Sequence, residues 1–457
     1  MSRGIVGALA AWRRHGWARL AGVVGVVVYA AMGVACSDEG VDTPPPLPPF
    51  LPLNAVDEAD PRHPGQEAFL RWTWGVEVLG GWPPADFMLG LMQDEPEVFG
   101  RQYERFGFLP DPSDDFPVGF KRGQDDPNRV HETCALCHVA ALPTGGHWLG
   151  APNNALDIGR FQVEVNRRWV AAGNSPLFDA LMEDKLLALG PGRTRAETAS
   201  YPVAVPAAFP VYYNLGDRQH LNYMGTGRDL RTEVSFSLFT FGAGNPNPRD
   251  ARVPFPSREH VDALVAFMGA LDPPPAPPQD PTLAARGRQV FEAARCVSCH
   301  VVDDVSQDFV VTLDRDPLGR ERHPGEDPAF PRGTIRTSAL HRVLQDGDEG
   351  GGPGVDEGFR DLIRFMASQR LAVRQTDGYR VNDLRGLWQS APYLHNGSVP
   401  TLEALLSPAA SRPETFAVAG GWVVDTRVLG NGAEGHEFGT DLSDEDKRAL
   451  IAYLLSL

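Results

Sequence analysis

Positive charge is scarce in this chain of 457 residues. It has 42 Lys and Arg against 59 Asp and Glu, which gives a formal net charge of −17. That deficit argues against nucleic acid and anionic membrane surfaces as partners. It fits a small basic redox partner, although a solvated acidic surface is the more common reason for such a charge. Pro (41) and Gly (48) are abundant instead, and they predict long irregular connections around compact helices.

Long apolar runs are also scarce. A basic segment, residues 13–19, precedes an apolar one, residues 20–35, that is too short to predict a membrane span with confidence. The pattern predicts a secretion signal over residues 1–35. The small residues before Cys36 resemble a bacterial lipoprotein box, except that Gly33 stands where a large aliphatic residue is usual. We therefore expect a periplasmic protein, lipid-anchored through Cys36 to the outer membrane, with ordinary cleavage and a spare thiol as the alternative.

Cysteine is also scarce, with only five in the chain. Four of them form two C-x-x-C-H runs, Cys134 and Cys137 with His138, and Cys296 and Cys299 with His300. Two nearby thiols add across the vinyl groups of one porphyrin, and the adjacent His binds its iron. A thioredoxin-like pair or half a zinc site would not need a His at that position. The spacing therefore predicts two covalent c-type haems.

An internal repeat supports a duplication. Residues 257–271 align without a gap with residues 443–457, so that Ala263 matches Ala449 and Phe267 matches Tyr453. Each stretch begins with a Ser suited to cap a helix and has one apolar face. The predicted fold class is mainly α, with two cytochrome c-like haem domains in tandem and long irregular loops.

The domain boundaries follow composition. We predict a Pro-rich tether over 36–62, an N-terminal haem c domain over 63–272, a Pro-rich linker over 273–280 and a C-terminal cytochrome c domain over 281–457. Residues 87–108, 161–189 and 283–295 have helical patterns, the second broken at 173–176. Residues 145–159 are typical of a loop. Residues 234–241 alternate like a short strand, with a haem-pocket loop as the alternative.

An acidic stretch at Asp346–Gly350 offers hard oxygen ligands that could bind Ca²⁺. A solvated acidic loop is the more common role for such a sequence.

The segment from Leu384 to Leu402 carries a specific likeness. Its Leu-Arg-Gly and Ala-Pro-Tyr-Leu-His-Asn-Gly-Ser elements resemble the matching block of dihaem bacterial cytochrome c peroxidases and the MauG superfamily. The downstream run from Gly435 to Leu442 resembles the rubber oxygenase (RoxA-like) branch. The likeness covers most of the chain from about Ala85 onward, specific in the second half and loose in the first.

The resemblance implies different roles for the two haems. The N-terminal haem, with His138 as proximal ligand, would be the reactive one, and the C-terminal haem, with His300, would relay electrons. His436 is the implied sixth ligand of the relay haem, while the peroxidases often use Met. No Met follows Met366, which excludes a Met ligand from this end. His395 is the competitor, although in the matching motif it more often lies at the haem edge.

The distal side of the first haem is less well defined. A peroxidase needs a base near the bound peroxide, and the candidates are His147 and then His220. Each has an ordinary loop role as its alternative. The aromatic residues Phe209, Tyr212 and Tyr213 favour an apolar distal wall instead, which would suit dioxygen or an apolar substrate. Trp388 is a candidate for electron passage between the haems, with core packing as its alternative.

The expected function is reduction of hydrogen peroxide at the N-terminal haem, with electrons delivered through the C-terminal haem from a small cytochrome or cupredoxin. Dioxygen-dependent oxidation of an organic, rubber-like substrate is the first alternative. A pure electron carrier without an open haem is the second.

Overall fold

The computed structural model describes residues 46–71, 82–123, 126–194, 206–223, 225, 227–242, 258–300, 310–312, 378–428 and 430–457. The described residues belong to one unit, Pro46–Leu457. The predicted secretion signal, Cys36 and the acidic stretch Asp346–Gly350 lie outside them, so these predictions have no structural outcome.

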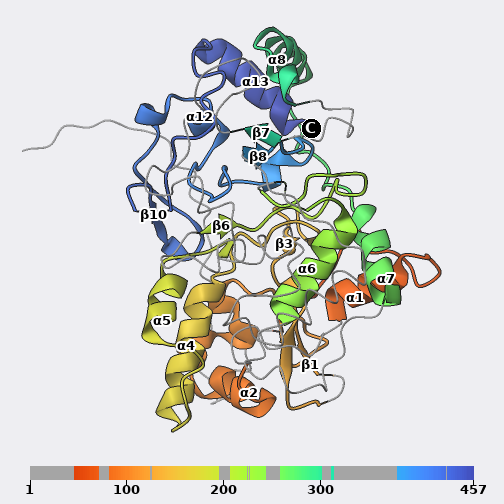
Figure 1. The fold of residues 1–457 in the computed structure, drawn as a ribbon, viewed down its shortest axis with the longest axis vertical. Helices are drawn as coiled ribbons and strands as arrows, with labels where there is room; N and C mark the ends of the chain where they lie inside the picture. Colours follow the sequence, from red (N-terminus) through yellow and green to blue (C-terminus); the bar gives the residue numbers. More distant parts are fainter. Residues whose placement is uncertain are drawn as a thin grey trace, which may run out of the picture. The chain divides into compact units, whose positions relative to one another are not determined.

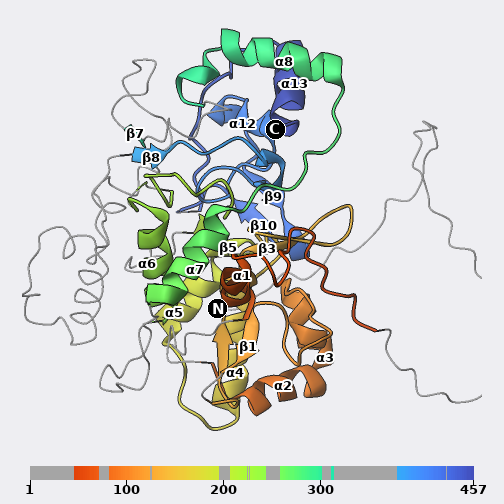
Figure 2. The ribbon, with the colours of Figure 1, turned by 90° about the vertical axis from the view of Figure 1, so that its right-hand side faces the viewer.

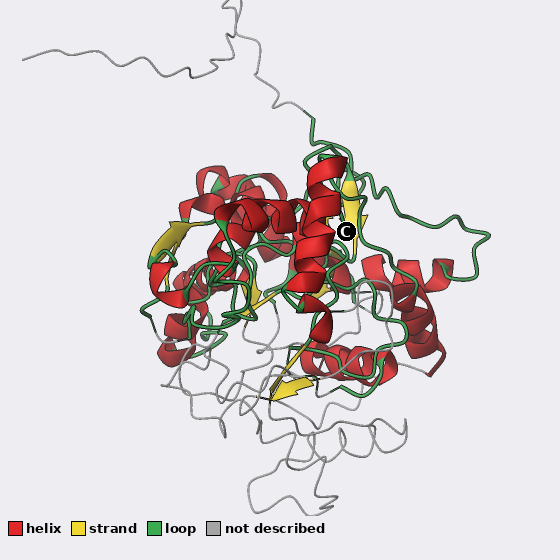
Figure 3. Cartoon of the chain, turned by 90° about the horizontal axis from the view of Figure 1, so that it is seen from above, coloured by secondary structure: helices red, strands yellow, loops and turns green. Residues whose placement is uncertain are grey.

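Helices dominate the regular structure, as the mainly α class predicted (Figures 1 and 3). Their bounds are α1 His63–Arg71, α2 Ala85–Asp94, α3 Pro96–Phe99, α4 Ile158–Ala171, α5 Ala180–Leu187, α6 Leu230–Gly242, α7 Arg258–Gly269, α8 Pro281–Ala293, α12 Leu402–Leu405 and α13 Asp444–Leu455. The predicted helices within 87–108, 161–189 and 283–295 are thereby confirmed in place. The tandem haem-domain organisation stays a prediction.

Two helices cross closely in the first half. Gly65 of α1 lies so near α7 that a Cβ atom there would collide with the carbonyl oxygen of Ala263. One turn further along, Phe69 meets Phe267 edge-on with 5.5 Å between ring centroids. Glycine is required at this crossing because any side chain would push the two backbones apart.

The same crossing recurs between α8 and α13 in the second half (Figure 2). A Cβ atom on Gly287 would collide with the carbonyl oxygen of Ala449, and Phe291 meets Tyr453 edge-on at 5.5 Å. The Oγ of Ser443 accepts a hydrogen bond from the Asp446 amide at the start of α13, as a capping Ser should. The aligned repeats therefore occupy equivalent positions in two similar helix pairs.

The described strands are short and form two-stranded antiparallel sheets. The pairs are β1 Phe120–Arg122 with β2 Val130–Glu132, β3 Val139–Ala141 with β4 His147–Leu149, β5 Arg193–Thr194 with β6 Ala207–Ala208, β7 Val310–Thr312 with β8 Gly378–Arg380, and β9 Thr415–Ala417 with β10 Val423–Asp425. They join loop segments rather than forming a core layer.

Two local predictions were wrong. Residues 234–241 lie within helix α6, whose first turn is capped by Asp229 through the Thr232 amide at 2.7 Å. The expected loop over 145–159 contains strand β4. Within the segment predicted to be a tether, the Leu53 amide donates to the His147 carbonyl at 2.9 Å, and the tether itself stays a prediction.

The two halves meet along the segment that carries the family likeness. Asn154 donates to the Ala391 carbonyl at 2.7 Å, and the Tyr213 hydroxyl donates to the Gly386 carbonyl at 3.0 Å. The Ala208 amide donates to the His395 carbonyl at 2.8 Å. The segment from Leu384 to Leu402 is thus fixed against the loops that follow the first C-x-x-C-H run.

Candidate functional site

Both C-x-x-C-H runs adopt the same local structure. In each, the two Cys flank a 3₁₀ turn, Cys134–Leu136 or Cys296–Ser298. The amide of the following His, His138 or His300, donates to the carbonyl of the first Cys, at 3.2 and 2.9 Å respectively. The turn therefore brings two thiols and an imidazole to one place in each half.

None of the four cysteines of these runs forms a disulfide. Burial raises the pKa of Cys134 to about 12 and also raises the pKa values of Cys137 and Cys296. Thiols that take part in disulfide exchange have lowered pKa values instead. The environment therefore argues against the thioredoxin-like reading of these pairs.

The two histidines share one orientation. His138 places Nδ1 3.1 Å from the Pro210 carbonyl, and His300 places Nδ1 3.2 Å from the Asn382 carbonyl. A carbonyl oxygen can only accept, so each Nδ1 carries the hydrogen and each Nε2 keeps a lone pair. Histidines that bind metals are usually oriented through such a bond. Both rings are therefore prepared to bind an iron through Nε2.

Their protonation state fits the same role. Burial lowers the pKa of His138 to about 3, although the Pro210 carbonyl opposes the shift. Burial likewise lowers the pKa of His300. A metal ligand must be the neutral imidazole, and both side chains are neutral at physiological pH.

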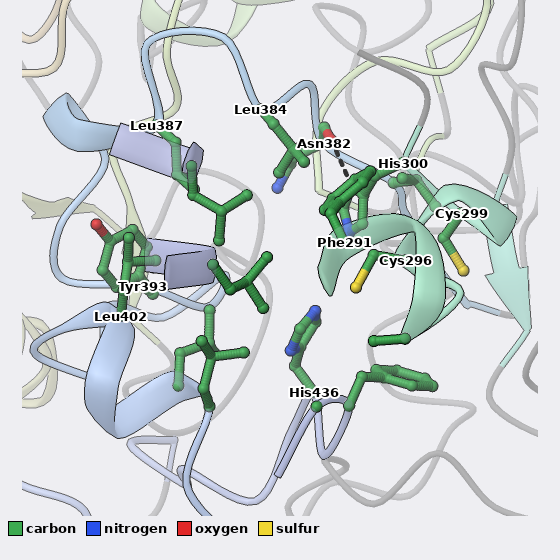
Figure 4. A pocket seen from close by; sticks show the side chains of 18 of the residues that line it. Phe291, Cys296, Cys299, His300, Asn382, Leu384, Leu387, Tyr393, Leu402 and His436 are labelled. Carbon is green, nitrogen blue, oxygen red and sulfur yellow. Dashed lines mark hydrogen bonds between the residues drawn. The ribbon is translucent and has the colours of Figure 1, made fainter. Parts of the chain in front are cut away.

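A cavity of about 830 Å³ opens beside the second run (Figure 4). Cys296, Cys299 and His300 lie on one side of it and His436 on another, with apolar walls that include Phe291 and Leu402. Pockets for large cofactors and ligands fall at about 300–1,000 Å³. The size, the apolar lining and the two cysteines outside any disulfide all fit a covalently bound porphyrin.

His300 and His436 face one another in this cavity, with 6.3 Å between ring centroids and an interplanar angle of 48°. Two metal–imidazole bonds of about 2.0–2.1 Å, together with the two ring radii, add up to roughly 6.2–6.4 Å. The spacing would therefore allow both imidazoles to hold one metal ion.

The loop that carries His436 is held in a strained conformation. His436 has φ of +58°, in the left-handed region that costs a non-Gly residue about 1–2 kcal/mol. The buried Arg412 offsets this cost by donating to the carbonyls of Ala433, Gly435 and His436. Strain that is held by surrounding bonds is typical of functional positions.

His395 lines the same cavity. Its ring stacks on Tyr379, with 4.8 Å between centroids, and burial lowers its pKa to about 4. Leu394 before it has φ of +69°, so the backbone turns sharply at this point.

Aromatic residues surround the first histidine. Tyr212 stacks flat on the His138 ring, with 3.5 Å between centroids and an angle of 11°, and Phe209 meets the ring edge-on at 6.4 Å. Tyr213 is buried where the halves meet. Phe209 and Tyr212 therefore contact the expected proximal ligand, and the distal wall stays a prediction.

His147 is engaged in strand pairing. Its Nδ1 accepts from the Leu51 amide at 3.1 Å, and its ring packs against Phe50 with 4.9 Å between centroids. This structural role argues against His147 as the distal base. His220 lies in the turn before Leu221, where its carbonyl accepts from Arg380 at 3.4 Å. Trp388 is half-buried in the 3₁₀ turn Leu387–Gln389, and its part in electron passage stays a prediction.

Glu233 is a candidate that sequence reasoning missed. Its carboxyl lies against the turn at Gly227, where a Cβ atom would come within 2.6 Å of Oε2. Burial raises its pKa to about 7, while Arg380 and a hydrogen bond from Asn222 oppose the shift. The charge of this carboxyl also raises the pKa of the Tyr212 phenol, and the Tyr212 ring stacks on His138. A carboxyl poised near neutral pH beside the first site is suited to proton transfer.

Comparison with known families relates one segment of the second half to haem proteins. Residues 378–417 match the family described as RoxA-like, cytochrome c-like. This match supports haem c as the cofactor and a haem cytochrome oxidoreductase as the class of protein. Within the described residues, no group of three or more His, Cys, Asp or Glu is arranged to hold a bare metal ion.

Two proteins of Sinorhizobium fredii are similar in sequence, and both are uncharacterized. Protein y4iJ is 41% identical over 105 residues, which cover 17% of this chain and 18% of y4iJ. Protein y4iM is 31% identical over 183 residues, which cover 37% of this chain and 38% of y4iM. The matches thus span less than two fifths of either relative.

Among solved structures, a MauG-like protein associated with microbial copper homeostasis aligns at 18% identity and a TM-score of 0.30, over 66% of this chain and 87% of that one. Hydrazine synthase of Kuenenia stuttgartiensis aligns at 15% identity and 0.26, over 55% and 73%. TM-scores this low carry no structural argument. None of the described helices is both long and apolar enough to span a bilayer.

Proposed function

We propose that this protein is an exported dihaem c-type cytochrome of the cytochrome c peroxidase, MauG and rubber oxygenase superfamily. It reduces hydrogen peroxide at the N-terminal haem with electrons that enter through the C-terminal haem. The observation that carries the proposal is the shared arrangement of the two C-x-x-C-H runs, in which His138 and His300 both direct Nδ1 to a backbone carbonyl. Each run then offers two thiols and one bare Nε2.

The C-terminal site is the electron relay in this proposal. Cys296 and Cys299 would attach the porphyrin, and His300 and His436 would hold its iron. Their spacing of 6.3 Å supports this assignment. Held by both imidazoles, the group would supply electron exchange rather than a place for peroxide.

The N-terminal site is the reactive one. Cys134 and Cys137 would attach the porphyrin and His138 would be its proximal ligand. When bound, the haem supplies the electrons that split the O–O bond. Reduction of one peroxide to two waters also consumes two protons, and these must pass through a group that can exchange them near neutral pH. Glu233 has the environment for that transfer, with burial raising its pKa to about 7.

A second candidate is dioxygen-dependent oxidation of an organic substrate. The match of residues 378–417 to the RoxA-like family favours this candidate, because the RoxA-like proteins form the rubber oxygenase branch that the sequence resembles. Under this alternative the first haem would bind dioxygen, and the second would keep its relay role.

Location and partners follow from the sequence. Covalent haem attachment at C-x-x-C-H runs suits an exported protein. A lipid on Cys36 would anchor the protein to the outer membrane, facing the periplasm. The net charge of −17 suits a basic donor cytochrome or cupredoxin.

A spectrum of the reduced holoprotein under carbon monoxide tests whether one haem is reactive and the other only relays electrons. We expect CO to shift the absorption of one haem and to leave the other unchanged. No shift at either haem would support a pure electron carrier and overturn the enzyme proposal. Turnover of peroxide with a reduced cytochrome, compared with dioxygen uptake in the presence of polyisoprene, then separates the two enzyme candidates.

A further inference from the structure

The loop over residues 430–438 carries His436 and contains no helix or strand. Its backbone carbonyls therefore need hydrogen-bond donors from elsewhere in the chain. Two buried side chains of the segment with the family likeness hold the first part of this loop. Asn396 Nδ2 donates to the Gly432 carbonyl at 3.0 Å, and Ser398 Oγ donates to the same carbonyl at 2.8 Å. The first part of the His436 loop is thus fixed by side chains rather than by regular structure.

Arg412 holds the second part of the His436 loop. It is buried, with 6% of its surface exposed. Its Nη1 donates to the carbonyl of Ala433 and, at 2.5 Å, to that of Gly435. Its Nη2 donates to the carbonyl of His436 itself, at 3.3 Å. The predicted haem ligand and the residues just before it are therefore bonded directly to one guanidinium.

The same guanidinium is also bonded to the end of helix α12. Nε donates to the Ala404 carbonyl at 3.1 Å and to the Ser407 carbonyl at 3.2 Å, and Nη2 donates to the Leu405 carbonyl at 3.2 Å. The last carbonyls of a helix have no partner inside it, and an Arg side chain can supply one. Helix α12 places Leu402 and Leu405 in the wall of the second cavity (Figure 4). The guanidinium therefore joins one wall of that cavity to the His436 loop.

A bond in the opposite direction closes this connection. The Ala409 amide, from the segment between α12 and Arg412, donates to Oε1 of Glu437 at 2.7 Å. Glu437 directly follows His436 in the chain. The backbone on both sides of the His436 imidazole is thus held by the segment that ends at Arg412.

We propose that Arg412 is the positioning residue that keeps the His436 imidazole in place as a ligand of the second haem. The inference rests on the proposed function, because it takes His436 as a ligand of that haem. His436 has φ of +58°, in the left-handed region that a non-Gly residue keeps only when its surroundings hold it there. Without the guanidinium, the carbonyls of the loop lose their donors, the backbone relaxes and the imidazole leaves its position opposite His300.

The test compares Arg412→Gln with the wild type in the intact holoprotein, by absorption and paramagnetic resonance spectra and by melting temperature. Gln is too short to bond both α12 and the loop, so the second haem should lose its low-spin signal and bind CO. Free imidazole should return the low-spin signal without restoring the melting temperature. A folded Arg412→Gln protein with a lower melting temperature but an unchanged low-spin signal would show a role in stability alone and overturn the proposal.

Arg412→Lys is the second variant, because it keeps a buried cation and should fold even if Arg412→Gln does not. Its single ammonium lacks the planar fork that reaches α12 and the loop together. Part of the low-spin signal of the second haem should therefore be lost. A full low-spin signal in this variant would overturn the proposal, because a cation without the fork would then be enough.

Arg427→Gln is the matched control. Arg427 lies between Arg412 and His436 in the sequence, but it is exposed and pairs with the Asp425 carboxylate at 2.8 Å. This change should leave the low-spin signal in place, and an equal loss in both variants would contradict a specific role for Arg412. A wild-type holoprotein without a low-spin haem would overturn the ligand pair of the proposed function and this inference together. A low-spin wild type with an unaffected Arg412→Gln variant would overturn the inference alone.

Discussion

The rings of His300 and His436 lie 6.3 Å apart at their centroids, on opposite sides of one apolar cavity. One ring comes from the C-x-x-C-H run and the other from a loop 136 residues later, so long-range folding sets their spacing. That loop is strained at His436 and fixed by Arg412.

His436→Ala should convert the relay haem from low spin to high spin, because one axial ligand is lost. Absorption and paramagnetic resonance spectra would record the change, and the variant should also bind CO at a second haem. His395→Ala is the control, since its ring stacks on Tyr379 at the cavity wall. An unchanged spectrum in His436→Ala would remove His436 from the ligand set.

Glu233→Gln should slow peroxide turnover by about 10²–10⁴-fold if this carboxyl transfers the proton. Because the pKa of Glu233 is raised to about 7, wild-type turnover that needs the carboxylate should fall as the pH drops below 7. Steady-state rates with a reduced cytochrome across pH 5–9 measure both effects.

Glu132→Gln is the control for that variant. Burial raises the pKa of Glu132 to about 7 as well, but its carboxyl accepts from Trp82 Nε1 at 3.1 Å, a bond that Gln retains. Loss of turnover in Glu132→Gln with normal turnover in Glu233→Gln would contradict the assignment.

Gly287→Ala should destabilise the protein, because the new methyl group would meet the backbone of Ala449 and the Cβ of Tyr453. Overpacking of this kind costs about 1–3 kcal/mol or more. Gly90→Ala in helix α2 is the control: its Cβ would meet only Asp94, at 3.8 Å, and the change should stabilise the protein by roughly 0.5–1 kcal/mol. Chemical denaturation measures both free energies of unfolding.

Lys121→Met should cost about 3–5 kcal/mol, because it leaves the buried carboxylate of Asp111 without its cation. Burial alone would raise the pKa of Asp111, but hydrogen bonds from Ser113 and Lys121 outweigh that effect and lower it. Arg122→Met is the neighbouring control, since its pair with Asp115 is exposed and should contribute no more than about 1 kcal/mol.

The sign of the pH effect at Asp111 follows from its lowered pKa. The ionised carboxylate stabilises the fold above its unfolded pKa, and that stabilisation is lost as the pH falls through the folded pKa. The melting temperature of the wild type should therefore drop below about pH 4, and the drop should be smaller in Lys121→Met. Equal acid sensitivity in both proteins would argue against this ion pair.

Local spacing made part of this structure predictable. The C-x-x-C-H runs fix their own turns, and the aligned repeats at Ala263 and Ala449 predicted helices that the structure places in matching crossings. Contacts between residues far apart in the sequence were not predicted. His147 was expected in a free loop because its pairing partner, Leu51, lies 96 residues earlier.

Glu233 was missed for a related reason. The alternation of large residues over 234–241 favoured a strand, whereas capping by Asp229 and packing against α7 make this segment helical. The environment of its carboxyl comes from the 221–227 turn and from β8, which no local pattern joins to α6.

Mass spectrometry of the denatured, correctly exported protein tests the two covalent haems most directly. We expect a single species that carries the mass of the mature polypeptide plus two porphyrins, retained because thioether bonds survive unfolding. A mass equal to the bare polypeptide would contradict both haem sites and the function built on them.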